Sequence, residues 1–290
     1  MSDAVADPDT MPPAAASPAP KGLREVIYRH TVLVRITHWV NALAIFFMIG
    51  SGLNIFNAHP NLYWGSKGSE VDPTGRWLSL HAMNTPQGPR GVTEVFGLHL
   101  DTTGVFGWSK VGDHFAARGF PAWLTIPSFQ DLADARHWHF FFAWILVLNG
   151  LVYLIWSLSI HHIQRDIVPT VADLKSIPKS IADHVRLKHP KGEEAKRYNV
   201  LQRLAYLGLL VMVLLVVYTG LTMSPGVNGF APWMLDLVGG RQSARSIHFV
   251  CMSLITLFIL VHVCEVFIAG PSNEICSMIT GKYAVAPEHD

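Results

Sequence analysis

The stretch "ARSIHFVCMSLITLFILVHVCE", residues 244–265, is almost wholly apolar and yet carries two histidines, His248 and His262, fourteen residues apart. In a helix that interval places them about 21 Å apart along the axis and about 40° apart around it. Both imidazoles would then point in nearly the same direction, one near each end of a membrane span. An imidazole inside a membrane needs a hydrogen-bonding partner or a metal, because hydrocarbon satisfies neither ring nitrogen.

The composition is typical of a membrane protein. Half of the 290 residues are hydrophobic and 15% are charged, whereas soluble domains average roughly 25% charged residues. The apolar residues gather in four runs close to the roughly 20 residues that cross a bilayer: about 36–56, 138–160, 204–223 and 246–268. We therefore expect an all-α membrane protein built as a four-helix bundle. The net charge of +1 gives no indication of nucleic-acid binding. The four apolar runs make membrane lipid the expected surrounding.

The segments outside the runs predict the orientation. Residues 1–20 lack the basic and apolar regions of a secretory signal, and residues 1–27 are expected to form a disordered tail. The connection 161–200 is the one densest in Lys and Arg, which places it in the cytoplasm by the positive-inside rule. Four spans then put both termini in the cytoplasm and the first connection, 57–136, on the outer side. The bundle domain would cover 28–270, followed by a C-terminal tail, 271–290.

The first connection is too long for a simple turn. Loops beyond about 15 residues are usually functional or disordered. This one is rich in Gly and Pro and holds four tryptophans, Trp64, Trp77, Trp108 and Trp123. The composition predicts an ordered cap or docking surface, and a flexible insertion is the alternative.

Two further histidines stand where they could meet the first pair. His38 lies at the start of the first predicted span and His139 at the start of the second. Because successive spans alternate in direction, His38 should lie level with His262, and His139 level with His248. Two b-type haems, one per pair, would use all four rings, since haem iron accepts a nitrogen on each face.

Three arginines repeat one spacing, because Arg35, Arg136 and Arg245 each precede one of these histidines by three residues. Residues at that interval share a helix face, and a guanidinium can bind a haem propionate through two hydrogen bonds. Snorkelling to the membrane surface explains a single arginine equally well. The spacing also favours His139 over His137, which would point about 200° away around the helix.

Two points bear on the kind of cofactor. Gly52 follows His38 by fourteen residues, where the first span would pass the outer haem, and a missing side chain there would let the macrocycle approach. Ordinary packing of small residues is the alternative for this glycine. Zinc is the competing metal, but each histidine pair would need further Cys, Asp or Glu ligands for tetrahedral closure. The spans offer no acidic residue beside the outer pair.

Motifs in all four runs resemble one family. They are "RITHW" (35–39), "RHWHFFFAW" (136–144), "YNVLQRLAY" (198–206), "TGLTMSP" (219–225) and "RSIHF" with a following "VHV" (245–263). The chain resembles the bacterial di-haem b-type cytochromes that anchor formate dehydrogenase and nickel–iron hydrogenase, and within them the thiosulfate-reductase-type cytochrome b subunits. The resemblance implies two haem b groups, a multi-pass location in the bacterial inner membrane, and electron transfer between quinone and a periplasmic, often molybdopterin-dependent, oxidoreductase subunit.

The resemblance also implies a quinone site near the cytoplasmic haem, beside Asn199 with Tyr198 and Gln202. That amide could equally cap the helix. Glu265 would relay a proton there, or would simply snorkel. We expect an electron-transfer subunit and not a complete enzyme. The alternatives are a stand-alone quinol-oxidising di-haem cytochrome and a haem-free transporter that uses histidines as proton or metal relays.

Overall fold

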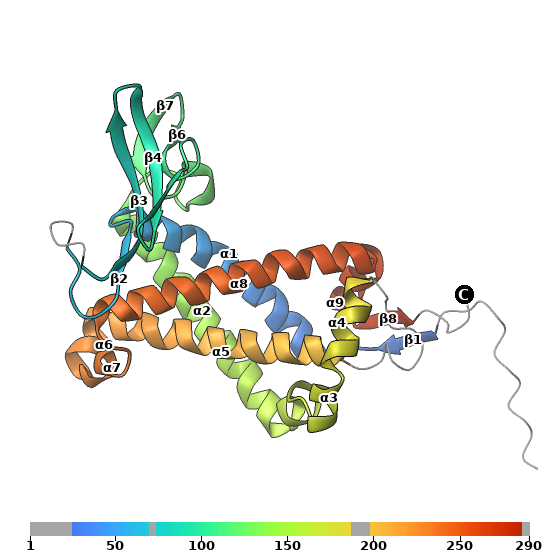
Figure 1. The fold of residues 1–290 in the computed structure, drawn as a ribbon. Helices are drawn as coiled ribbons and strands as arrows, with labels where there is room; N and C mark the ends of the chain where they lie inside the picture. The colour runs from blue at the N-terminus through green and yellow to red at the C-terminus, as the bar shows by residue number, and fades with distance from the viewer. Residues whose placement is uncertain (1–24, 70–73, 187–197, 286–290) are drawn as a thin grey trace, which may run out of the picture.

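Four long helices dominate the fold. The computed structural model describes residues 25–69, 74–186 and 198–285 (Figure 1). Its long helices are α1 (Val32–Asn57), α2 (Leu132–Ser159), α5 (Val200–Met223) and α8 (Arg241–Ala269). Each is long and apolar enough to cross a membrane, so the predicted four-span membrane architecture is confirmed.

Each long helix begins four to six residues before its predicted apolar run, because polar residues outside the run start it. Thr31 caps α1 by accepting from the Val34 amide, and Asp131 caps α2 by accepting from the Ala133 and Asp134 amides at 2.8 and 3.0 Å. Such caps satisfy amides that have no partner inside the helix. The hydrophobic run therefore marks the lipid-crossing part and the cap marks the true start.

The helices pack as two close pairs, α1 with α2 and α5 with α8. Ala44, Phe142 and Leu146 form the buried contact of the first pair. A polar contact adds to it, because Asn149 donates to the Asn41 side chain at 2.7 Å and to the Thr37 carbonyl at 2.8 Å. The buried contact of the second pair consists of Val216, Cys251 and Ile255.

The described part of the long first connection, residues 58–69 and 74–131, is folded and rich in β structure. Strands β2 (Asn61–Tyr63), β3 (Arg76–Thr85), β4 (Gly88–Val95) and β5 (Leu98–Asp101) form an antiparallel sheet in that order. Strands β6 (Gly107–Val111) and β7 (His114–Arg118) form a hairpin beside it, and the short helix η2 (Ala122–Leu124) leads on to α2. Figure 1 shows these strands projecting beyond one end of the long helices. We call residues 58–69 and 74–130 the cap.

The cap is fastened to the start of α8. A buried cluster of Phe56, Leu62, Leu78 and Leu80 packs against Phe249 of that helix. Hydrogen bonds add to this packing. Trp77 Nε1 donates to Ser246 Oγ at 2.9 Å, and Arg245 donates to the Asn61 and His59 carbonyls. The cap is therefore part of the folded core and not a flexible insertion.

Most of the remaining segments lie at the opposite end of the molecule. Strand β1 (Glu25–Tyr28) pairs antiparallel with β8 (Lys282–Val285), and α9 (Pro271–Thr280) joins α8 to β8. The second connection supplies η3 (Ile163–Ile167), α3 (Val171–Lys175) and α4 (Ile177–Val185). The third connection, with α6 (Pro225–Phe230) and α7 (Trp233–Asp236), lies at the cap end.

The predicted tails differ from the structure at their inner edges. Residues 271–285 are folded, because β8 pairs with β1 and the Asn273 side chain exchanges two hydrogen bonds with the Ala284 backbone at 3.0 Å each. Residues 25–27 of the predicted N-terminal tail belong to the same small sheet. The rest of that tail, residues 1–24, and residues 286–290 lie outside the described residues.

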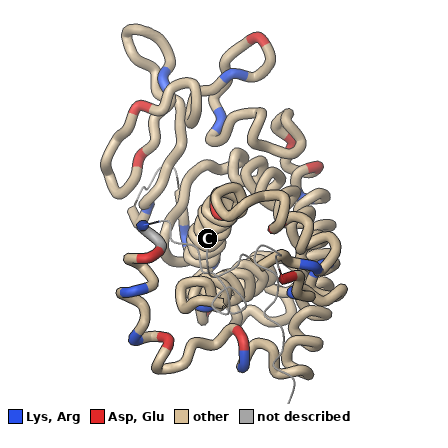
Figure 2. Tube along the Cα trace, turned by 90° about the vertical axis from the view of Figure 1, so that its right-hand side faces the viewer, with Lys and Arg blue, Asp and Glu red and all other residues tan. Residues whose placement is uncertain are grey.

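Charged residues follow this division of the molecule. Figure 2 shows Lys, Arg, Asp and Glu on the cap and on the connecting segments, while the long helices are mostly free of them. An uncharged middle between two charged ends suits a bilayer.

Candidate functional site

The structure brings the four predicted histidines together in two pairs. His38 of α1 faces His262 of α8 with their ring centroids 6.3 Å apart. His139 of α2 faces His248 of α8, also at 6.3 Å. One pair lies toward the cap and the other toward α9, at opposite ends of α8. We call them the outer pair (His139 and His248) and the inner pair (His38 and His262).

The separation within each pair suits one shared metal. Two metal–nitrogen bonds of about 2 Å, with about 1 Å more from each nitrogen to its ring centre, place two ring centres about 6 Å apart. Among the described residues, no three His, Cys, Asp or Glu side chains form a group that could hold a metal ion. The donor set therefore fits haem iron, which needs only two protein nitrogens, and does not fit a tetrahedral zinc site.

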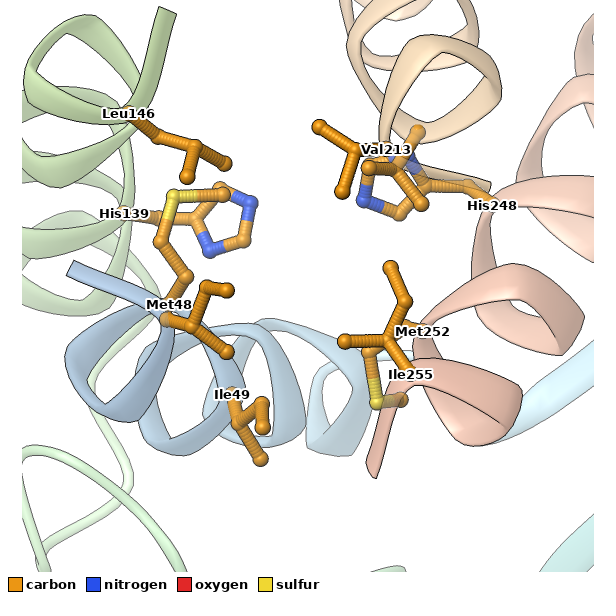
Figure 3. Close-up of a pocket in the computed structure, with 10 residues that line it drawn as sticks. Met48, Ile49, His139, Leu146, Val213, His248, Met252 and Ile255 are labelled. Carbon is orange, nitrogen blue, oxygen red and sulfur yellow. The ribbon is translucent and has the colours of Figure 1, made fainter. Parts of the chain in front are cut away.

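A cavity separates the rings of the outer pair. Figure 3 shows His139 and His248 entering it from opposite walls. The space between the rings that holds no protein atoms, including the part open to the outside, is about 410 Å³. The other lining residues are all apolar: Ile45, Met48, Ile49, Leu146, Val213, Val216, Met252 and Ile255. A cavity with two imidazoles in an apolar wall suits the flat hydrocarbon body of a porphyrin.

Sequence reasoning missed two hydroxyl groups that contact the outer pair. Ser51 Oγ lies 3.2 Å from Nδ1 of His139, and Thr219 Oγ1 lies 3.0 Å from Nδ1 of His248. The signal that could have revealed them is a repeated tripeptide, "SGL" at 51–53 and "TGL" at 219–221. Each tripeptide lies on the helix that packs closest to the helix carrying the histidine.

Gly52 lies beside a histidine ring. We predicted that its missing side chain would make room for the macrocycle. A Cβ built on Gly52 would lie 3.3 Å from Cε1 of His139, and one on Gly220 would lie 3.5 Å from Cε1 of His248. The space that each glycine leaves is therefore used by the imidazole.

The inner pair is held by aromatic contacts. The Phe258 ring stacks on His262 at 6.0 Å, and Trp39 meets His38 edge-on at 5.3 Å. Trp39 Nε1 donates to the Met278 carbonyl of α9 at 3.1 Å. Within the described part of the chain, no side-chain hydrogen bond reaches either inner ring, in contrast to the outer pair.

The three arginines predicted to bind haem propionates make different contacts in the structure. Arg35 donates to the Ile279 carbonyl of α9, and Arg245 donates to two carbonyls of the cap. Arg136 is exposed and lies over the ring of Phe140, 5.5 Å from its centroid. Two of the three arginines thus fasten neighbouring segments, and propionate binding by all three stays a prediction. His137 is exposed on α2, away from the outer pair.

The residues predicted to bind quinone lie at the inner end. Asn199 and Gln202 form a reciprocal capping box at the start of α5, with bonds of 2.9 and 3.1 Å. In the structure the Asn199 and Gln202 side chains therefore cap α5, which was the alternative to quinone binding. Tyr198 packs edge-on against Tyr206 at 5.3 Å, and burial raises the pKa of its phenol. Glu265 is half-buried, one turn after His262.

Comparison with known proteins agrees with this geometry. Residues 29–281, which include all four long helices and both histidine pairs, match the family described as prokaryotic cytochrome b561. A protein of Azospira oryzae named putative protein-methionine-sulfoxide reductase subunit YedZ1 is 26% identical over 248 residues, 84% of this chain and 92% of that protein. The predicted membership in a b-type cytochrome family is confirmed. The chain belongs to the prokaryotic cytochrome b561 family, whose members are membrane proteins that bind haem b and transfer electrons.

Proposed function

We propose that the chain is a di-haem membrane subunit that carries electrons between a quinone pool and an oxidoreductase on the periplasmic side. The observation that carries the proposal is the presence of two histidine pairs with the same 6.3 Å separation. Each pair would hold one haem b. The outer haem would be bound by His139 and His248, and the inner haem by His38 and His262.

The chain's own residues would bind the two haems, orient them and exclude water from them. A haem with two axial imidazoles supplies reversible one-electron chemistry. The apolar wall around the outer pair would exclude water and bury the porphyrin. Arg35, Arg136 and Arg245 would supply positive charge for the propionates at the two ends, where each lies one turn from its histidine.

The cap supports an external protein as the partner on the outer side. It is an ordered β-rich unit fastened beside His248, and the related Azospira oryzae protein is named as a subunit of a reductase. By the family resemblance, the partner would be a periplasmic, molybdopterin-dependent oxidoreductase. The basic second connection would then face the cytoplasm of a bacterium and the cap its periplasm. An ordered unit at this place therefore favours a protein partner over a stand-alone quinol-oxidising cytochrome.

The quinone would bind at the inner end. Tyr198, Asn199, Gln202 and Glu265 all lie near the end of the bundle that holds the inner pair. A phenol or an amide can donate a hydrogen bond to a quinone carbonyl. Glu265, one turn from His262, would exchange the proton that accompanies the electron.

The test is a reduced-minus-oxidised visible spectrum with haem quantification on the purified full-length protein. We expect two low-spin haem b groups per chain. His139→Ala and His248→Ala should each lose the outer haem, whereas His38→Ala and His262→Ala should lose the inner one. His137→Ala is the matched control and should keep both haems. A colourless wild-type protein, or the same loss from His137→Ala as from His139→Ala, would overturn the proposal.

A further inference from the structure

The outer pair has a feature that electron transfer by itself does not explain. In each close helix pair, a hydroxyl residue followed by glycine lies against the imidazole of the partner helix: Ser51-Gly52 against His139, and Thr219-Gly220 against His248. We propose that Ser51 and Thr219 are positioning residues that hold each outer imidazole in the one tautomer and orientation that turns Nε2 toward the cavity. The inference rests on the proposed binding of a haem by this pair.

The direction of the hydrogen bonds follows from the hydroxyl groups. Ser51 has one proton, and it donates that proton to the Phe47 carbonyl at 2.6 Å. Toward His139 it can therefore only accept, so we assign the proton of that contact to Nδ1 of the ring. Thr219 likewise can only accept from Nδ1 of His248, since it donates its own proton to the Leu215 carbonyl at 2.7 Å.

A proton on Nδ1 decides what the other ring nitrogen can do. In neutral imidazole one nitrogen donates and the other carries a free lone pair. Holding the proton on Nδ1 leaves the lone pair on Nε2, the atom available to a metal. Metal-binding histidines commonly donate their second N–H in this way, which fixes the ring and makes it a stronger ligand.

The surroundings make this arrangement costly to change. Ser51 and Thr219 are both fully buried, so an imidazole N–H that lost its hydroxyl acceptor there would have no water to replace it. The glycines that follow leave room for the rings, because an added Cβ would stand 3.3 Å from His139 at Gly52 and 3.5 Å from His248 at Gly220. The hydroxyl fixes Nδ1, while the bare glycine backbone leaves room for Cε1.

The experiment uses Ser51→Ala and Thr219→Val in the purified full-length protein, with haem content and a potentiometric titration as readouts. We expect each variant to lower the haem affinity of the outer site by about 10- to 100-fold. The midpoint potential of the outer haem should shift in the positive direction, because a less basic imidazole stabilises oxidised iron less. The inner haem should keep its affinity and potential, which also shows that the variant is folded.

The chain offers matched controls. Thr222→Val removes another fully buried hydroxyl from α5, one that donates to the Thr219 carbonyl at 2.8 Å, and should leave both haems unchanged. Ser51→Thr and Thr219→Ser retain the hydroxyl and should restore the wild-type potential.

Two results would overturn the inference in different ways. Unchanged outer-haem affinity and potential in both Ser51→Ala and Thr219→Val would show that the hydroxyls do not position the rings, while leaving the two-haem proposal intact. Absence of haem from the wild-type protein would remove the proposed function itself, and the inference with it.

Discussion

At the scale of single residues, the four imidazoles differ in what holds them. The outer rings of His139 and His248 each contact a buried hydroxyl. The inner ring of His262 is stacked on Phe258. A hydrogen bond fixes both the tautomer and the rotation of a ring, whereas stacking fixes only its plane. The outer pair should therefore tolerate less change in its immediate neighbours.

Replacing Gly52 by alanine tests that tolerance. A Cβ at this position would approach His139 to 3.3 Å, which is close enough to displace the ring by a few tenths of an ångström. We expect the haem affinity of the outer site to fall by about tenfold, with the inner site unchanged. Haem content measured during detergent dilution gives the two affinities.

Two other glycines serve as controls for this substitution. Gly220→Ala would place its Cβ at 3.5 Å from His248, an ordinary contact, and Gly150 has nothing within 4 Å of a built Cβ. Gly150→Ala should keep both haems, and Gly220→Ala should have a smaller effect than Gly52→Ala. Equal losses at all three positions would show that contact between the added Cβ and the ring is not responsible.

At the scale of helices, the two close pairs repeat one arrangement. In α1, His38 precedes Ser51 by thirteen residues, and in α5, Tyr206 precedes Thr219 by the same interval. In α2, Tyr153 follows His139 by fourteen residues, and in α8, His262 follows His248 by the same interval. The outer pair thus comes from equivalent helices, α2 and α8. The inner pair comes from non-equivalent helices, and tyrosines occupy the matching positions on α2 and α5.

A polar contact sets the register of the first helix pair. Asn149 donates to Asn41 at 2.7 Å and to the Thr37 carbonyl at 2.8 Å. Asn149→Leu should destabilise the protein by about 1–2 kcal/mol, because Asn41 is left without this partner in an apolar interior. Adding Asn41→Leu should recover part of the loss, since no unsatisfied amide then remains. Thermal unfolding in detergent measures both, and additive losses would contradict a direct coupling between the two side chains.

The sequence predicts those features that depend on local spacing. Four spans follow from run length, and the facing of His248 and His262 follows from their interval on one helix. Contacts between distant segments are not encoded in this way. The Ser51–His139 hydrogen bond joins positions 88 residues apart, and Glu25 pairs with Val285. Helical periodicity identifies an apolar face but not the helix that will cover it, so the hydroxyls and the small β1–β8 sheet could not be predicted.

At the scale of the whole molecule, the described segments divide between two ends. The cap, α6 and α7 lie at one end, and β1, α3, α4, α9 and β8 at the other (Figure 1). Composition predicted an ordered cap from its tryptophans. The strand order could not be derived from the sequence. Alternation of polar and apolar residues predicts which face of a strand is buried, but it does not specify the neighbouring strand or the register of the pairing.

Cysteine labelling tests the orientation of these ends. In a background without Cys251, Cys264 and Cys276, the exposed positions Asp113 in the cap and Lys175 in α3 are each replaced by cysteine. We expect a membrane-impermeant maleimide to label Asp113→Cys in intact spheroplasts. Lys175→Cys should react only after permeabilisation, because basic connections stay in the cytoplasm. The reverse pattern would invert the proposed topology.

The start of α8 both contacts the cap and carries a histidine of the outer pair. Arg245, Ser246 and Phe249 fasten the cap, and His248 stands among them in the chain with its ring turned into the cavity. A close-packed interior transmits strain because it compresses little. A protein that pressed on the cap would therefore displace residues within one helical turn of His248. We therefore expect that docking of a protein on the cap would shift the visible absorption spectrum of the haem proposed to bind there.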